Sequence, residues 1–156
     1  KIKGGDDMLR DQEVLLAAAD SLKKNGIKNT PQRQVILAYL MTGRKHPSVE
    51  MIYEYVCQNG FSVSLATVYN TLELLLKHKL IVEVAPDNSG HMRYDYLGTP
   101  HYHVICVNCD KIIDVENGAY RDLENDAAQV TGYHVYNSKY EVYGLCPECQ
   151  QHYQAK

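Results

Sequence analysis

The apolar pattern changes from helical to extended within one stretch, residues 64–96, which reads SLATVYNTLELLLKHKLIVEVAPDNSGHMRYDY. Ser64 is a favourable helix N-cap, and the apolar residues after it recur at the spacing of one helix face. These residues are Leu65, Val68, Tyr69, Leu72, Leu75 and Leu76. Further on the period becomes two, and a turn-forming run at 86–90 separates extended segments at 80–85 and 91–96. The stretch therefore predicts a helix followed by a β-hairpin.

Three more helices are predicted before this stretch. Apolar residues at helical spacing occur within 13–24, 31–41 and 48–59, and Thr30 with Pro31 is typical of a helix start. The short link to the next helix has the length of the turn in a helix-turn-helix. Helices followed by a hairpin are the layout of a winged helix. Similar small bundles occur in proteins that do not touch DNA, so the pattern alone leaves DNA binding open.

The chain after residue 96 predicts a smaller mixed unit. Gly98 and Pro100 indicate a hinge. The expected elements are strands at 101–106 and 111–115, a helix at 119–130, and one or two strands within 133–145. Residues 1–7 carry no apolar pattern, and we leave them out of the fold prediction.

The predicted fold class is therefore α+β, with three parts. A winged helix-turn-helix domain is expected at 8–96, a hinge at 97–100, and a small α/β domain at 101–156. Charge separates the two larger parts as well. Residues 1–86 hold 11 Lys and Arg against 9 Asp and Glu, net +2, and residues 87–156 hold 5 against 10, net −5, which sum to the −3 of the chain.

Composition restricts the class of protein. No apolar run approaches the roughly 18 to 20 residues that span a bilayer, so we expect a cytoplasmic protein without a membrane partner. The +2 of the first part permits contact with DNA without requiring it. Five cysteines are few and odd in number for a disulfide scaffold.

Four of the cysteines form two C-x-x-C pairs, which favour a structural zinc site. The ligands of this site are Cys106, Cys109, Cys146 and Cys149. The two-residue gap lets both thiolates of a pair face one cation, and four sulfurs close a tetrahedral shell. Free thiols, two disulfides and a redox C-x-x-C are the alternatives. Cys57 is left over on a helix, and we interpret it as a small buried apolar residue.

A second group of metal-type side chains is weaker in pattern. His101 and His103 share one face of a predicted strand, because residues two apart point the same way. Asp95 and Asp114 lie on neighbouring predicted strands. His46 lies in the other half, and spacing alone predicts only a surface histidine or one at a helix start.

These positions together resemble the ferric uptake regulator family, and specifically its peroxide-sensing (PerR-type) branch. The resemblance extends over nearly the whole chain after Met8. It is carried by Thr30-Pro-Gln-Arg33, His46-Pro-Ser, Ser64-Leu-Ala-Thr-Val-Tyr-Asn70, Arg93-Tyr-Asp95, His101-Tyr-His103, the first C-x-x-C pair, Asp114, Tyr143-Gly-Leu-Cys146 and Cys149. The paired aspartates, and Ser138 where relatives with an extra site carry histidine, favour the peroxide-sensing branch.

The resemblance implies a metal-dependent repressor that works as a homodimer through domain 101–156. A regulatory Fe²⁺ or Mn²⁺ would be held by His46, Asp95, His101, His103 and Asp114. Hydrogen peroxide would react at Fe²⁺ and add oxygen to His46 or His101, after which the operator is released. The implied partner is an AT-rich palindrome of double-stranded DNA. The contacting residues would be Lys28, Arg33, Ser64, Ala66, Thr67, Tyr69 and Asn70, with Lys77 adding charge.

Alternative functions stay open at this point. An iron-, manganese- or zinc-uptake regulator would use the same sites to sense metal alone. From another class, a zinc-ribbon redox protein or a metal-dependent hydrolase could combine C-x-x-C pairs with a His/Asp group. The sequence has no H-E-x-x-H or comparable signature, and we therefore predict that the protein is not an enzyme.

Overall fold

The computed structural model describes residues 5–43 and 45–152, with side chains from residue 11 onward. The chain divides between Gly98 and Thr99 into two compact units. The division falls inside the segment 97–100. Of residues 1–7, which were left out of the fold prediction, 1–4 lie outside the described part, whereas Gly5 already begins the first helix.

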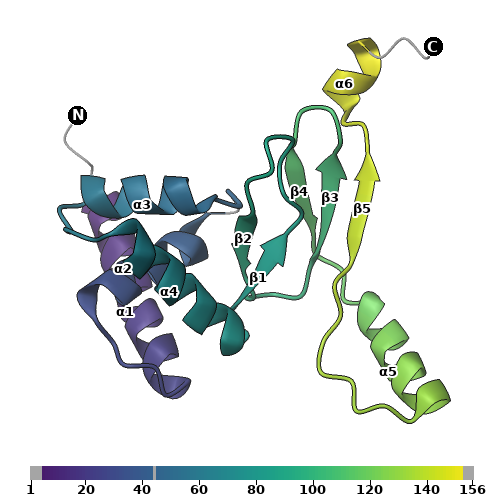
Figure 1. Ribbon diagram of the computed structural model, residues 1–156, viewed down its shortest axis with the longest axis horizontal. Coiled ribbons are helices and arrows are strands. Elements are labelled where there is room, and N and C mark those ends of the chain that lie inside the picture. Colours follow the sequence, from purple (N-terminus) through teal and green to yellow (C-terminus); the bar gives the residue numbers. More distant parts are fainter. Residues whose placement is uncertain (1–4, 44, 153–156) are drawn as a thin grey trace. The chain divides into compact units, whose positions relative to one another are not determined.

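The first unit is a helical bundle with a hairpin (Figure 1). Its elements are α1 (Gly5–Lys24), α2 (Pro31–Thr42), α3 (Val49–Gln58), α4 (Leu65–Lys77), β1 (Ile81–Val84) and β2 (Arg93–Tyr96). The strands are antiparallel, with Ile81 opposite Tyr96 and Val84 opposite Arg93. The helix order and the hairpin confirm the winged helix-turn-helix that the sequence predicts.

Side-chain caps explain where the helices of this unit begin. Thr30 accepts a hydrogen bond from Arg33 N at 3.3 Å, and Ser64 accepts one from Thr67 N at 3.1 Å. Each bond satisfies a backbone N–H that has no partner inside its helix. Ser48 caps α3 in the same way through Met51 N. The predicted N-caps at Thr30 and Ser64 are therefore confirmed.

One apolar core fills the first unit. Leu22, Ile36, Ile52 and Leu72 are fully or almost fully buried and come from each of the four helices, while Ile81 adds the hairpin. Burying a side chain of this size contributes about 1.5–3 kcal/mol. The core therefore fixes α4 and the hairpin on one rigid body.

Two sequence predictions for this unit are wrong. Cys57 is exposed on α3, so it is not the small buried residue that we expected. The buried face of α4 is also narrower than the predicted stripe, because Leu65 and Tyr69 are 41% and 45% exposed. Both errors arise at the edge of an amphipathic face, where the pattern alone does not say which side of the boundary a residue takes.

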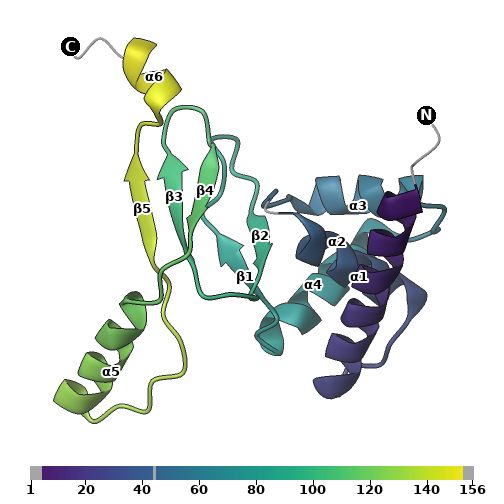
Figure 2. The ribbon, with the colours of Figure 1, turned by 180° about the vertical axis from the view of Figure 1, so that it is seen from behind.

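The second unit is a three-stranded sheet with two helices (Figures 1 and 2). Its elements are β3 (Tyr102–Cys106), β4 (Ile112–Val115), α5 (Tyr120–Thr131), β5 (Glu141–Gly144) and α6 (Pro147–His152). The order is β4-β3-β5, in which β3 pairs antiparallel with β4 and parallel with β5. Only β5 forms within 133–145, and α6 was not predicted.

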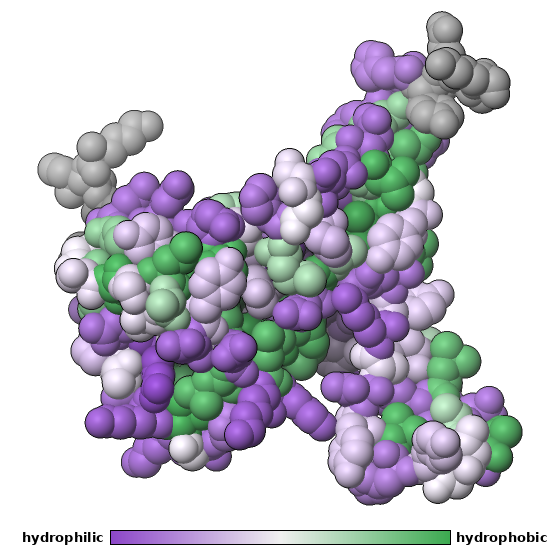
Figure 3. Space-filling model, viewed as in Figure 1, coloured by the Kyte–Doolittle hydropathy of each residue, from purple (hydrophilic) through white to green (hydrophobic). Residues whose placement is uncertain are grey.

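Helix α5 ends as the sequence suggests, but it covers no core of its own. Gly132 adopts φ +72°, the left-handed conformation that favours glycine, and caps the helix through Ala128 O. None of the helix residues is buried, and Leu123 and Val130 are 61% and 77% exposed. Apolar atoms are visible over α5 in Figure 3. The helix thus presents an apolar face to its surroundings.

Among the described residues, none of the helices combines the length and the apolar character needed to cross a membrane.

Candidate functional site

The four paired cysteines meet at one end of the sheet in the second unit. Cys106 ends β3, Cys109 follows in a tight turn, and Cys146 and Cys149 lie at the start of α6. The parallel pairing places Cys106 beside Gly144, and Val107 N donates to Gly144 O at 2.9 Å. Sheet register therefore brings together two pairs that are far apart in sequence.

The sulfur geometry fits zinc. All four Sγ atoms lie within 4.8 Å of one another, and Cys109 and Cys146 are 3.8 Å apart. A tetrahedron with Zn–S bonds of about 2.3 Å has edges of about 3.8 Å. A disulfide would need a sulfur separation of about 2.05 Å, and all of these cysteines are free.

The polar surroundings of the sulfurs also suit a cation. Cys146 N donates to Cys106 Sγ at 3.3 Å, and this bond, together with N–H groups of Cys109 and Asn108, lowers the pKa of Cys106 to about 6. Asn108 donates to Cys149 and lowers its pKa, but contacts with Cys146, burial and the other sulfurs outweigh it and raise the pKa to about 12. Four such close sulfurs ionise together only when a cation balances them.

A second donor set lies at the opposite end of β3. His103 is paired in register with Asp114 on β4, and its Nε2 lies 3.6 Å from Asp114 Oδ1. His101 Nε2 lies 4.0 Å from the same oxygen, and the two imidazole rings meet edge to face at 5.0 Å. The second unit thus brings together two imidazoles and one carboxylate, as strand periodicity suggests.

One of these rings is oriented by a backbone group. His101 Nδ1 lies 2.7 Å from Thr99 O. Donation of Nδ1–H to this carbonyl leaves Nε2 as the atom that can bind a metal, and outer contacts of this kind commonly fix a ligand histidine. His101 Nε2 is also the atom that faces Asp114.

The first unit holds a separate pair of candidate ligands. His46 Nε2 lies 3.9 Å from Asp95 Oδ2, although the residues belong to the link before α3 and to strand β2. A β-bridge between Ser48 and Arg93 and a 3.0 Å bond from Tyr94 N to Pro47 O tie the link to β2. Sequence spacing could not predict this pairing, because it depends on that bridge.

His46 has an unusual backbone conformation. Its φ is +45°, in the left-handed region that non-glycine residues seldom adopt. Holding a residue there costs of order 1 kcal/mol or more, which the surrounding bridge must offset. Strained residues of this kind cluster at functional sites, and here the strain turns the imidazole toward Asp95.

Sequence reasoning missed Glu141, which lies beside His103 on the sheet. The two residues are partners in the parallel register of β3 and β5, so their side chains share one face. The Glu141 side chain is 9% exposed, accepts a hydrogen bond from the Tyr143 hydroxyl and pairs with Lys139 at 3.0 Å. A strand predicted over 133–145 without its register could not reveal this neighbour.

The candidate DNA contacts gather in the first unit, at the start of α4. Ser64 Oγ bonds the Thr67 hydroxyl at 3.0 Å, and the Tyr69 side chain points out from the core with 45% exposed. The other candidates on this helix, Ala66 and Asn70, are exposed. Exposure of Tyr69 removes the alternative that it is only a core aromatic.

The basic candidates lie at the N-terminal end of α2. Arg33 Nη1 donates to Lys28 O at 2.9 Å, and Lys28 itself is exposed. A shallow pocket joins this end of α2 to α4, and it is lined by Thr30, Gln32, Arg33, Thr67, Asn70 and Thr71. Lys77 is exposed in the last turn of α4, away from this pocket.

Comparison with known proteins gives consistent similarities. Residues 24–143 match the Ferric uptake regulator family. The peroxide operon regulator of Bacillus subtilis is 37% identical over 137 residues, which cover 88% of this chain and 94% of that protein.

Solved structures share the fold. The ferric uptake regulator of Helicobacter pylori, a protein with three functional metal-binding sites, has a TM-score of 0.66 at 27% identity and covers 90% of this chain and 93% of its own. The manganese-containing regulator of Pseudomonas aeruginosa has a TM-score of 0.67 at 25% identity, with 82% and 96% covered.

Proposed function

Because the chain belongs to the ferric uptake regulator family, we propose that it is a metal-dependent transcriptional repressor that senses hydrogen peroxide. The observation that carries the proposal is that both units prepare metal donors. His46 and Asp95 face each other in the helical unit, and His101 and His103 face Asp114 in the sheet unit. A regulator that couples metal to DNA needs ligands on both units.

The five side chains would hold one divalent ion. Three imidazoles and two carboxylates suit Fe²⁺ or Mn²⁺, which prefer mixed nitrogen and oxygen ligands, whereas the four sulfurs suit zinc. The sulfur shell is closed, so zinc there would serve folding. Thr99 O, by orienting His101, and the strained link at His46 would prepare these ligands before the metal arrives.

Binding of this ion would couple metal to DNA. A metal that takes ligands from both units favours the arrangement in which all five can reach it, and so selects one conformation of the protein. In a homodimer this conformation would set the spacing of the two α4 helices on successive half-sites of an AT-rich palindrome. Lys28, Arg33, Ser64, Ala66, Thr67, Tyr69 and Asn70 are the proposed contacts.

The dimer would form through the second unit. Apolar side chains on and after α5 and on β5 are exposed in the single chain, among them Leu123, Val130, Tyr133, Tyr136 and Val142. Exposed apolar groups of this number favour burial against another surface. A second copy would cover them and present two equivalent DNA-binding units. We place this action in the cytoplasm, because the proposed partner is genomic operator DNA.

Peroxide sensing would use the same ligands. Fe²⁺, when bound, supplies the electrons that reduce peroxide and leave one oxygen atom on a histidine. His46 and His101 are the proposed acceptors of that oxygen. An oxidised imidazole is a poorer ligand, so the coupling between units would be lost and the operator released. Mn²⁺ is harder to oxidise, and the manganese form would stay on DNA.

A gel shift combined with mass spectrometry tests the proposal. The full chain is loaded with Mn²⁺ or Fe²⁺ and bound to an AT-rich palindrome, with and without peroxide. We expect both metals to give a shifted band, and peroxide to abolish the band only with Fe²⁺ and to add one oxygen atom to peptides containing His46 or His101. Oxidation confined to cysteines would contradict the histidine mechanism. Release without any peroxide dependence would favour an uptake regulator instead.

A further inference from the structure

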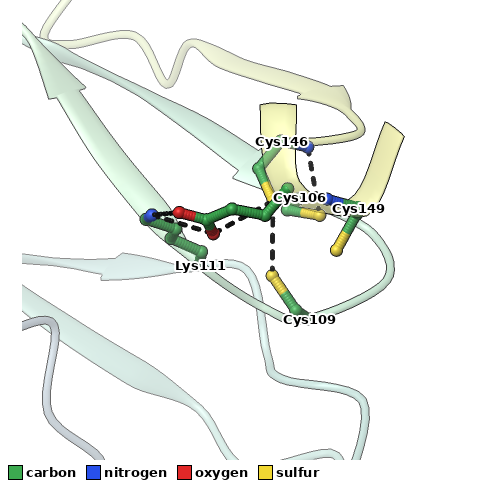
Figure 4. A network of polar contacts seen from close by, with 6 residues as sticks. Cys106, Cys109, Lys111, Cys146 and Cys149 are labelled. Atoms are coloured by element: carbon green, nitrogen blue, oxygen red, sulfur yellow. Dashed lines mark hydrogen bonds and ion pairs between the residues drawn. The ribbon is translucent and has the colours of Figure 1, made fainter. Parts of the chain in front are cut away.

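Two contacts outside the sulfur shell cross from one C-x-x-C pair to the other. Asn108 Nδ2 donates to Cys149 Sγ at 3.2 Å. Lys111 Nζ lies 3.1 and 3.2 Å from the two carboxylate oxygens of Glu148, and Figure 4 shows Lys111 beside the four labelled cysteines. Each contact therefore joins the turn after β3 to helix α6.

The backbone fixes both donors close to the sulfurs. Asn108 lies inside the first pair, in the turn closed by the 3.0 Å bond from Asp110 N to Cys106 O. Lys111 O accepts a hydrogen bond from Cys106 N at 2.9 Å. The two side chains are thus held by the same backbone that holds the ligands.

Charge gives these contacts a purpose. Four thiolates around Zn²⁺ carry a net charge of −2, and Glu148 Oε2 lies only 3.8 Å from Cys146 Sγ. A carboxylate against an anionic centre is unfavourable, and it favours loss of the metal. The ammonium of Lys111 is bound to that carboxylate and offsets its charge, while the Asn108 amide stabilises the thiolate of Cys149 directly.

We propose that Asn108 and Lys111 are positioning residues of the zinc centre, which keep its two halves together and slow the release of the metal. Lys111 acts by neutralising Glu148, and Asn108 acts by donating to a ligand sulfur. Neither touches the metal. The proposal concerns zinc retention alone and stands independently of peroxide sensing and DNA binding.

The exposure of these groups sets the size of the effect. Lys111 and Glu148 are 47% and 72% exposed, so water and salt weaken their attraction. We expect zinc release to become about five-fold faster without either donor, below the roughly 10- to 100-fold typical of buried outer contacts. Salt should reduce the Lys111 effect more than the Asn108 effect, because the latter is a short-range hydrogen bond.

The experiment follows zinc transfer from the purified full chain to an excess of a chromogenic chelator. Wild type is compared with Asn108→Ala, Lys111→Met, Glu148→Gln and the double variant Lys111→Met/Glu148→Gln. Lys139→Met is the matched control, because it removes a cation of the same unit that pairs with Glu141 rather than near the cysteines. Zinc content before the transfer and circular dichroism confirm that each variant is loaded and folded.

The charge argument predicts a particular order of rates. Asn108→Ala and Lys111→Met release zinc several-fold faster than wild type, Glu148→Gln and Lys139→Met do not, and the double variant returns toward the wild-type rate. Lys111→Arg should also restore it. The proposal is overturned if Lys111→Met behaves like Lys139→Met, if the double variant is as fast as Lys111→Met, or if wild type is purified without zinc.

Discussion

Strand β3 carries a different kind of donor set at each end, and the difference separates a structural role from a responsive one. At its C-terminal end, Cys106 joins three other sulfurs in a shell that needs nothing more. At its N-terminal end, His101 and His103 meet one carboxylate, Asp114, which is fewer donors than Fe²⁺ or Mn²⁺ normally takes. A closed set stabilises one unit, whereas an incomplete set can respond to what completes it.

The ligand types support the same distinction. Soft thiolates hold zinc, which has no redox chemistry, while imidazole and carboxylate suit the metals that can exchange or react. Both sets depend on the register of the same strand, because β3 pairs with β5 at Cys106 and with β4 at His103. Four substitutions test whether the two ends are as independent as this view requires.

The largest effect is expected from Cys106→Ser. Loss of a sulfur from a closed shell removes most of the folding free energy that zinc supplies, which for small zinc domains is about 10–16 kcal/mol. The second unit should lose its zinc and its cooperative melting transition, measured by metal analysis and thermal circular dichroism. The control is Cys57→Ser, which changes an exposed cysteine of α3 and should keep both. Retention of zinc by the Cys106 variant would refute a structural centre.

Asp114→Asn should affect the other end of β3 alone. The carboxylate that both histidines face becomes a neutral amide, so Mn²⁺ affinity should fall by at least roughly 10- to 100-fold, the range of outer-contact losses. Calorimetric titration with Mn²⁺ measures the loss, and metal analysis should still give zinc at the wild-type content. The exposed Glu124→Gln on α5 is the control. Simultaneous loss of zinc would show that the two ends are not independent.

Tyr69→Ala should weaken operator binding without changing either metal. An aromatic contact with a thymine methyl contributes on the order of 1 kcal/mol, so the dissociation constant should rise by roughly ten-fold. Fluorescence anisotropy with the manganese form measures it. Tyr69→Phe keeps the ring and should bind nearly as well as wild type. If the alanine variant also loses metal or thermal stability, Tyr69 is a structural residue.

The smallest effect is expected from Glu141→Gln. This carboxylate lies beside His103 in the sheet register and is bound by Lys139 and Tyr143. Removing its charge should weaken Mn²⁺ binding by about three-fold, near the lower limit for outer contacts. The calorimetric comparison is made with Lys139→Met, which keeps the carboxylate. An unchanged affinity in the glutamine variant would show that the metal donors end at Asp114.

Sequence predicted the parts of this molecule that depend on local patterns. The N-caps at Thr30 and Ser64 and the helical periods were visible, because both act within a few residues. The two C-x-x-C pairs predicted a sulfur cluster, because each pair is itself local. Only a resemblance to a known family placed His46 with Asp95, since their contact depends on the bridge between Ser48 and Arg93.

Features that depend on tertiary packing were out of reach. Cys57 was placed inside because its neighbour Val56 is fully buried, and a rotation of one residue around α3 reverses that assignment. Glu141, Asn108 and Lys111 gained their places from strand register and from the approach of α6 to the turn after β3. No pattern within one segment contains that information.

The parallel pairing of β3 with β5 also has a consequence for how the chain folds. Cys106 and Cys146 are 40 residues apart, and the intervening chain includes β4 and α5. A metal that bridges them in the unfolded chain closes a loop of this length, which removes about 4 kcal/mol of chain entropy in the cross-link treatment. Slow long-range pairing is what limits the folding of such sheets. Refolding of the second unit should therefore be faster with zinc present from the start than with zinc added afterwards.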